Sequence, residues 1–140
     1  MTKDVRISLR GMQFGEDGAG DIETDVTGTY YEKNRSHYVL YEEVMEGFRE
    51  PVRNRIKFGE HFLELTRSGP VNVRMIFEEK KKHMSNYHTP YGDILLGIDT
   101  KAVGIVKEPD LIRIDVGYAL ELNNEYLADC KILITIYNII

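Results

Sequence analysis

Arg67 is the residue of this sequence with the clearest potential for chemistry, because it interrupts an apolar strand face. Side chains of a β-strand alternate between its two faces, so Leu63, Leu65 and Arg67 share one of them. A guanidinium held away from water is costly unless a counter-charge accompanies it. The sequence therefore predicts that Arg67 projects from the apolar face and meets either a carboxylate or an anionic ligand.

The partners of Arg67 depend on the parity of the strand expected over residues 36–45. If Tyr38, Leu40 and Val44 face inward, Glu42 does too and is the nearest predicted carboxylate. In one interpretation Arg67 binds the acidic group of a small ligand, in a cavity lined by Tyr38, Tyr87, Tyr91 and Tyr118, with His61 on the same apolar face. In the other, Arg67 and Glu42 form a structural pair, or Arg67 lies at the rim beside the turn at residues 68–69.

The sequence carries no catalytic or metal-binding signature. Neighbouring carboxylates such as Glu42-Glu43 point to opposite strand faces and cannot act as an acid and base pair on one site. The four histidines lack metal-ligand spacing, and the single cysteine, Cys130, falls on an apolar face as a small core residue. The glycine-rich segment 15–21 lacks the Gly-Lys-Ser/Thr ending of a phosphate loop. We expect no catalytic residue, metal site or cofactor.

The net charge of the chain indicates which classes of partner are expected. The 140 residues contain 18 Lys and Arg against 23 Asp and Glu, a formal net charge of −5, which argues against a general affinity for nucleic acid or anionic membrane. Basic residues cluster at 49–57 and 80–82, but Glu64 is expected between Arg55 and Arg74 on a solvated face. Nucleic acid is therefore not an expected partner.

The cysteine count, the N-terminal residues and the apolar stretches predict the cellular compartment. One cysteine permits no internal disulfide, and no basic-then-apolar leader precedes the first strand-like segment. The longest apolar stretch, residues 132–140, is far shorter than the ~20 residues that a membrane-spanning helix needs. We expect a single cytoplasmic domain over residues 1–140, with no membrane segment.

The last hairpin can be aligned from sequence alone. A three-residue loop at 123–125 sets Leu122 opposite Tyr126, and the same register continues to Ile112 opposite Ile136. The isoleucine-rich final strand would be a hazardous exposed edge, so we expect it to be paired on both sides.

A second group of strands covers residues 52–77. A two-residue turn at 59–60 aligns Phe58 with His61, and a turn at 68–70 aligns Arg67 with Val71. On the opposite face this arrangement places Arg55, Glu64 and Arg74 side by side as a charge ladder.

Nine or ten strands with hairpin connections and no amphipathic helix predict an all-β fold. The economical closed form is a single antiparallel up-and-down β-barrel of about eight to ten strands.

Several segments resemble a known family, the YwiB-like proteins (DUF1934), and together they cover most of the chain. They are Tyr41-Glu42-Glu43, Ile56-Lys57, residues 65–69, 75–77 and 87–92, Ile98-Asp99-Thr100, and residues 118–123. This resemblance implies a calycin-type, lipocalin-like β-barrel from a cytoplasmic bacterial protein of unknown function. It implies a fold and no activity.

Two functions remain open at this point. The first is a non-enzymatic small-molecule-binding barrel with an apolar or weakly acidic ligand near Arg67. The alternative is a structural or protein-interaction barrel that acts through its outer surface, with a homodimer as one form of it. That surface carries Phe62, Ile76, Leu133 and Tyr137.

Overall fold

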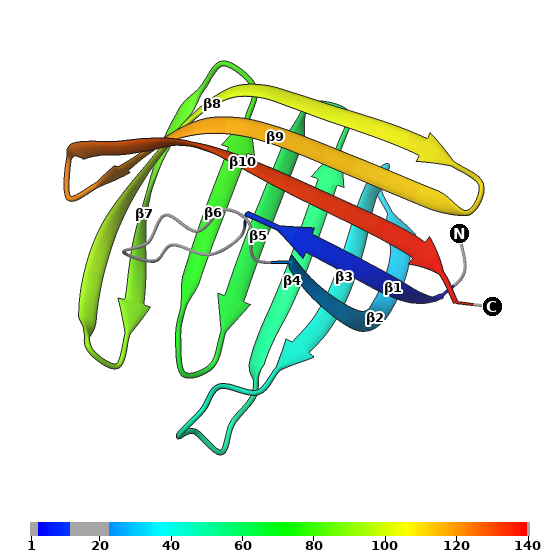
Figure 1. Cartoon of the computed structure of the whole chain (residues 1–140), viewed down its shortest axis with the longest axis horizontal. Helices are drawn as coiled ribbons and strands as arrows, with labels where there is room; N and C mark the ends of the chain where they lie inside the picture. Colours follow the sequence, from blue (N-terminus) through cyan, green and yellow to red (C-terminus); the bar gives the residue numbers. More distant parts are fainter. Residues whose placement is uncertain (1–2, 12–22, 140) are drawn as a thin grey trace.

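The computed structural model describes residues 3–11 and 23–139, and its regular elements form one antiparallel sheet of ten strands (Figure 1). The glycine-rich segment 15–21 lies outside the described residues. The order across the sheet is β6-β5-β4-β3-β2-β1-β10-β9-β8-β7. The strands are β1 (Asp4–Arg10), β2 (Glu23–Lys33), β3 (Ser36–Glu43), β4 (Val52–Gly59), β5 (Phe62–Ser68), β6 (Val73–Glu78), β7 (Lys82–Thr89), β8 (Gly92–Glu108), β9 (Leu111–Leu122) and β10 (Glu125–Asn138).

The two end strands of this order, β6 and β7, meet and nearly close the sheet into a barrel. Asn72 N–H donates to the His88 carbonyl at 2.9 Å, and His88 N–H donates to the Asn72 carbonyl at 2.8 Å. The Lys80 amide adds a bond of 2.9 Å to the Thr100 carbonyl. The prediction of a single up-and-down barrel is confirmed, with a seam between β6 and β7. Figure 1 shows β8–β10 crossing β3–β6 at a steep angle, so the barrel is flattened.

The last hairpin confirms most of its predicted register. Pairs from Ala128 opposite Leu120 to Ile136 opposite Ile112 form as expected, and β10 pairs with β1 on its other side. The pairing of Leu122 with Tyr126 is wrong, because Leu122 lies opposite Glu125. Asn123 and Asn124, at φ 50° and 70°, make a tight two-residue turn, and a bulge after Tyr126 absorbs the extra residue.

The hairpins of β4, β5 and β6 are displaced by two residues from the predicted register. Phe58 pairs with Leu63 instead of His61, and Arg67 pairs with Val73. Because the displacement is even, each side chain keeps its predicted face. His61 is the exception, since it belongs to the turn and its side chain is exposed rather than directed into the barrel.

The strand β8 is 17 residues long. A bulge between Thr100 and Ala102 lets it stay paired with β9 along its length. The C-terminal part of β8 places Lys107 near His37.

Large side chains fill the space between the layers. Inward positions of all the strands except β2 and β7 contribute hydrophobic side chains that are less than 2 % exposed, among them Ile7, Val39, Ile56, Phe58, Leu63, Met75, Phe77, Leu96, Ile98, Ile114, Ile132, Ile134 and Ile136. Burial of this apolar area is the main driving force for the fold.

Candidate functional site

Arg67 projects from the inner face, near the end of β5, as the sequence predicts. Its Nη2 donates to Glu43 Oε1 at 3.1 Å, and its Nη1 donates to the Tyr87 hydroxyl at 2.9 Å. The side chain is 27 % exposed, which places it at the opening of the barrel rather than in its centre. The expectation of a carboxylate partner is therefore met, by Glu43.

The expectation that Glu42 supplies this carboxylate is wrong, because the inward parity of β3 is the other one. Val39 and Tyr41 are buried, whereas Leu40 is 39 % exposed. Tyr38 and Glu42 share the outward face with Leu40, and Tyr38 stacks there on Tyr31 at 4.8 Å between ring centroids. Both parities of β3 carry apolar residues, so alternation alone does not decide between them.

The surroundings of Arg67 form a closed polar cluster. Asn54 Nδ2 donates to Glu43 Oε1 at 2.9 Å, and burial together with the charge of Glu43 raises the pKa of Tyr41 above its ordinary value. The bond to Tyr87 links β5 to β7 across the seam. Arg67 Nε is buried and has no partner among the described residues. This arrangement fits a structural pair, and a ligand role for Arg67 stays a prediction.

The remaining predicted ligand residues lie apart from this cluster. Tyr91 is 91 % exposed in the turn between β7 and β8, and the exposed His61 side chain has its Nδ1 3.6 Å from Glu79 Oε2. Tyr118 is 2 % exposed and packs edge-on against Phe77 with 4.9 Å between ring centroids. Burial, with a contribution from Cys130, raises the pKa of Tyr118.

Cys130 itself is half-buried and packs against the core, and burial raises the pKa of its thiol. The sequence places Cys130 on an apolar face as a small core residue, and the structure agrees with that face.

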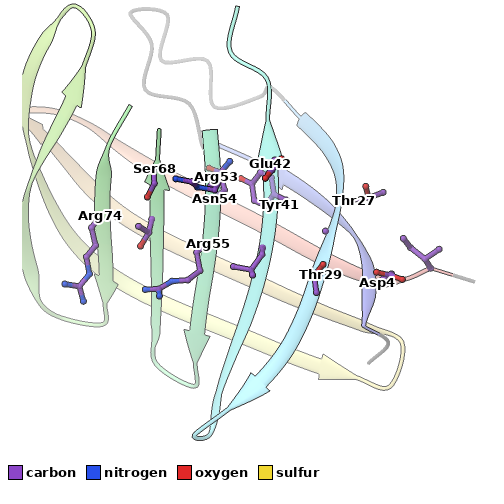
Figure 2. A pocket seen from close by; sticks show the side chains of 14 residues that line it. Asp4, Thr27, Thr29, Tyr41, Glu42, Arg53, Asn54, Arg55, Ser68 and Arg74 are labelled. Carbon is purple, nitrogen blue, oxygen red and sulfur yellow. The ribbon is translucent and has the colours of Figure 1, made fainter. Parts of the chain in front are cut away.

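A large hollow lies on the opposite, outer face of β2–β6, and we call it the outer groove (Figure 2). Its volume is about 940 Å³. Figure 2 shows Arg53 and Arg55 on one strand, β4, and Arg74 on β6, with Ser68 on the strand between them. The full lining is Asp4, Thr27, Gly28, Thr29, Leu40, Tyr41, Glu42, Arg53, Asn54, Arg55, Thr66, Ser68, Arg74 and Ile139.

The groove opens where β2 and β3 part. Their pairing runs from Lys33 opposite Ser36 to Thr29 opposite Leu40 and ends there, although β3 continues to Glu43. At the parting point a Cβ on Gly28 would lie 2.4 Å from the Leu40 carbonyl oxygen, so only glycine fits. Because β2 and β3 are no longer paired beyond this point, residues of both strands line the outer groove.

Arg55, Glu64 and Arg74 contact one another on the outer face as predicted, although they lie diagonally rather than directly opposite, and the two arginines line the outer groove. Glu64 accepts from Arg74 Nε at 2.7 Å and from Arg55 Nη2 at 3.3 Å. Its carboxylate is 8 % exposed and therefore buried rather than solvated as expected. Burial raises the pKa of Glu64, but the hydrogen bond and charge of Arg74, with Arg55 and Lys57, outweigh it and hold the pKa below its ordinary value.

Two buried polar atoms at the floor of the groove lack partners among the described residues. They are Arg55 Nε and Thr66 Oγ1, on residues that are direct cross-strand neighbours. Buried polar groups in folded proteins are nearly always hydrogen-bonded, and an unmade bond costs about 1–3 kcal/mol. Within the described ranges the Arg53 guanidinium has no hydrogen bond or ion pair either, although Glu42 is its cross-strand neighbour. These groups could bind an acceptor-rich ligand.

The outer apolar residues of the alternative function do not form one patch. Phe62 and Ile76 lie on β5 and β6, whereas Leu133 and Tyr137 lie on β10, and all four are half-buried. At least three strands separate the two pairs in either direction around the sheet.

Residues 3–11 and 23–139 contain no group of three or more His, Cys, Asp or Glu that could hold a metal ion. In the same residues no helix has the length and apolar character to cross a membrane.

Comparison with known proteins identifies the family and supports the fold. No curated protein matches the chain. Its structure is similar to the crystal structure of the ywiB protein from Bacillus subtilis, with a TM-score of 0.75 and 21% sequence identity over 98% of this chain and 91% of that one. The family model described as a domain of unknown function (DUF1934) matches residues 7–134. The chain therefore belongs to the DUF1934 family.

Proposed function

We propose that this protein is a non-enzymatic binding protein whose outer groove takes a small molecule carrying carboxylate or phosphate groups. The observation that carries this proposal is a set of donors without partners among the described residues, namely the exposed Arg53 guanidinium and, at the floor of the groove, Arg55 Nε and Thr66 Oγ1. Guanidinium groups recognise such oxyanions through paired N–H donors, and hydroxyls add further hydrogen bonds.

The size of the groove suits this class of ligand. Its volume of about 940 Å³ falls near the upper end of the ~300–1,000 Å³ that small-molecule sites occupy. Hydroxyls of Thr27, Thr29 and Ser68 line it beside the arginines. A polar, multiply charged compound fits this lining better than an apolar one.

The outer groove is favoured over the inner site near Arg67. Two of the Arg67 nitrogens already donate to Glu43 and Tyr87, so an anion would have to compete with a carboxylate of the chain. The inner face is also filled by side chains such as Phe58 and Phe77, which are fully buried. An apolar or weakly acidic ligand at Arg67 is the less supported form of the proposal.

The location that goes with this proposal is the cytoplasm, where a single unpaired cysteine such as Cys130 stays reduced. The outer groove is independent of the oligomeric state, and a homodimer remains an untested prediction.

Calorimetric titration with citrate, a small tricarboxylate, tests the proposal. We expect saturable binding that Arg53→Gln weakens at least tenfold, which corresponds to about 1.4 kcal/mol. Glu42→Gln removes a competing carboxylate beside Arg53 and is expected to strengthen binding. Arg113→Gln, on an exposed position of β9, is the matched control and should change nothing.

If Arg53→Gln and Arg113→Gln weakened citrate binding equally, only the net charge of the protein would matter, and the outer groove would be rejected as the binding site. Absence of saturable binding to citrate, inorganic pyrophosphate and inorganic phosphate would reject an oxyanion ligand.

A further inference from the structure

A second, separate hollow lies at the end of the barrel that His37 occupies. Two adjoining spaces of about 470 and 300 Å³ share the lining residues His37, Gly59, Glu60 and Lys107. The turns between β2 and β3, between β4 and β5, and between β8 and β9 lie close to these residues in the chain. We call this region the His37 end. It is independent of the outer groove.

His37 is rigidly held at the base of this hollow. Its side chain is 10 % exposed, and the ring lies parallel to Phe58 at 4.9 Å between centroids and to Tyr30 at 5.9 Å. His37 Nδ1 lies 2.6 Å from the Tyr30 hydroxyl, and Lys107 Nζ lies 3.5 Å from His37 Nε2. Both ring nitrogens therefore have a polar neighbour.

The direction of these hydrogen bonds follows from charge. Burial lowers the pKa of His37 and Lys107 lowers it further, against the opposing charge of Glu32, so the ring is neutral near pH 7. A lysine ammonium can only donate, so Nε2 accepts and Nδ1–H donates to Tyr30. The Tyr30 hydroxyl then donates to Glu32 Oε1 at 3.3 Å, and burial followed by the charge of Glu32 raises the pKa of Tyr30 to about 12.

Four charged side chains around the hollow are left without an opposite charge after this chain is formed, because Glu32 contacts only the Tyr30 hydroxyl and the neutral His37 ring. Lys107 contacts only the neutral ring of His37, and Arg35 and Glu60 have no ion pair among residues 3–11 and 23–139. Arg35 and Lys107 line the larger space together with Glu60. Phe58 and Ile105 supply an apolar wall in the smaller one. The hollow thus offers positive charge, negative charge and an apolar surface within a small volume.

We propose that the His37 end binds a small zwitterion of the amino-acid class. Its carboxylate lies against Lys107 and Arg35, its ammonium against Glu60, and its apolar side chain against Phe58 and Ile105. A simple anion would leave Glu60 uncompensated, and a simple cation would leave Lys107 and Arg35 uncompensated. Only a molecule that carries both charges satisfies the lining.

Titration of the protein with L-leucine, followed by the ring resonances of His37, tests this inference. We expect a saturable shift of these resonances. Lys107→Gln and Glu60→Gln each remove one charge from an exposed side chain and should each weaken binding at least tenfold without unfolding the protein. Lys101→Gln is the matched control, because Lys101 lies on the same strand and pairs with Asp99 outside the hollow. It should bind leucine as the unaltered protein does.

Acetate, which carries only the negative charge, and propylamine, which carries only the positive charge, complete the test. Each should bind at least tenfold more weakly than leucine. Acetate binding as tight as leucine, or unchanged leucine binding in Glu60→Gln, would overturn the zwitterion in favour of an anion. No saturable shift of His37 with leucine, or equal losses in Lys107→Gln and Lys101→Gln, would overturn the site altogether.

Discussion

The inner and outer faces of the same strands differ in whether the chain supplies an acceptor for each arginine. On the inner face, Arg67 donates to Glu43 and to Tyr87, so the chain itself supplies acceptors. On the outer face, Arg55 and Arg74 share the carboxylate of Glu64, but Arg53 has no partner among the described residues. A charge that the fold satisfies contributes to structure, whereas a charge left unsatisfied beside a hollow is available to a ligand. This difference is why we locate binding outside the barrel.

The two faces also differ in how completely they are filled. The inner face packs Phe58 and Phe77 with no exposure, while the outer face is hollowed where β2 leaves β3 beyond Thr29 and Leu40. Close packing inside and a hollow outside predict different responses to substitution.

Phe58→Ala should have the largest effect, a loss of about 3–5 kcal/mol in the free energy of unfolding, because it leaves a cavity in a filled interior. Urea denaturation measures it. A loss below about 1 kcal/mol would mean that the inner face is loosely packed, and the contrast between the faces would disappear.

Arg67→Met should cost about 1–3 kcal/mol, because it strands Glu43 and removes the link to Tyr87 across the seam. Glu43 is 35 % exposed, which keeps the cost below that of a fully buried pair. Citrate affinity should not change. Retained stability together with lost citrate binding would instead give Arg67 the ligand role.

Acidification should expose the contribution of Glu64. Its pKa is lowered in the fold, so its stabilisation is present above the ordinary glutamate value of 4.5 and is lost as the pH falls through the lowered pKa. As the pH is lowered through this range, we expect the free energy of unfolding of the unaltered protein to fall by about 0.5–1 kcal/mol more than that of Glu64→Gln. Urea midpoints at several pH values measure it. Parallel pH curves for the two proteins would show that Glu64 is not held by the arginines.

Thr66→Val should have the smallest effect and the opposite sign. It replaces a buried hydroxyl that has no partner by a methyl group of similar size, so stability should rise by about 0.5–1 kcal/mol. Citrate binding should weaken at the same time. A destabilised variant would indicate that Thr66 Oγ1 is satisfied within the folded protein.

The inner face could be predicted from sequence to a large extent. Alternation assigns the faces of β4, β5, β9 and β10, and these assignments survive the two-residue displacement at His61 because it is even. The face of β3 could not be assigned, because Val39 and Leu40 are equally apolar and only the folded barrel shows which is buried. That ambiguity led to Glu42 in place of Glu43.

The outer groove could not be predicted, because it depends on where the pairing of β2 with β3 stops. The residues that line it look like an ordinary solvated face, with arginines and hydroxyls at alternate positions. Gly28, between Thr27 and Thr29, was the available signal, since a glycine within a strand often marks a bend or a close approach of backbones.

Mapping citrate onto the backbone amides by two-dimensional NMR tests the central claim most directly. The outer groove predicts that the largest shifts fall on Leu40, Arg53, Arg55 and Thr66, and that they vanish in Arg53→Gln. Shifts centred on Glu43, Arg67 and Tyr87 that persist in Arg53→Gln would contradict it and place the ligand inside the barrel.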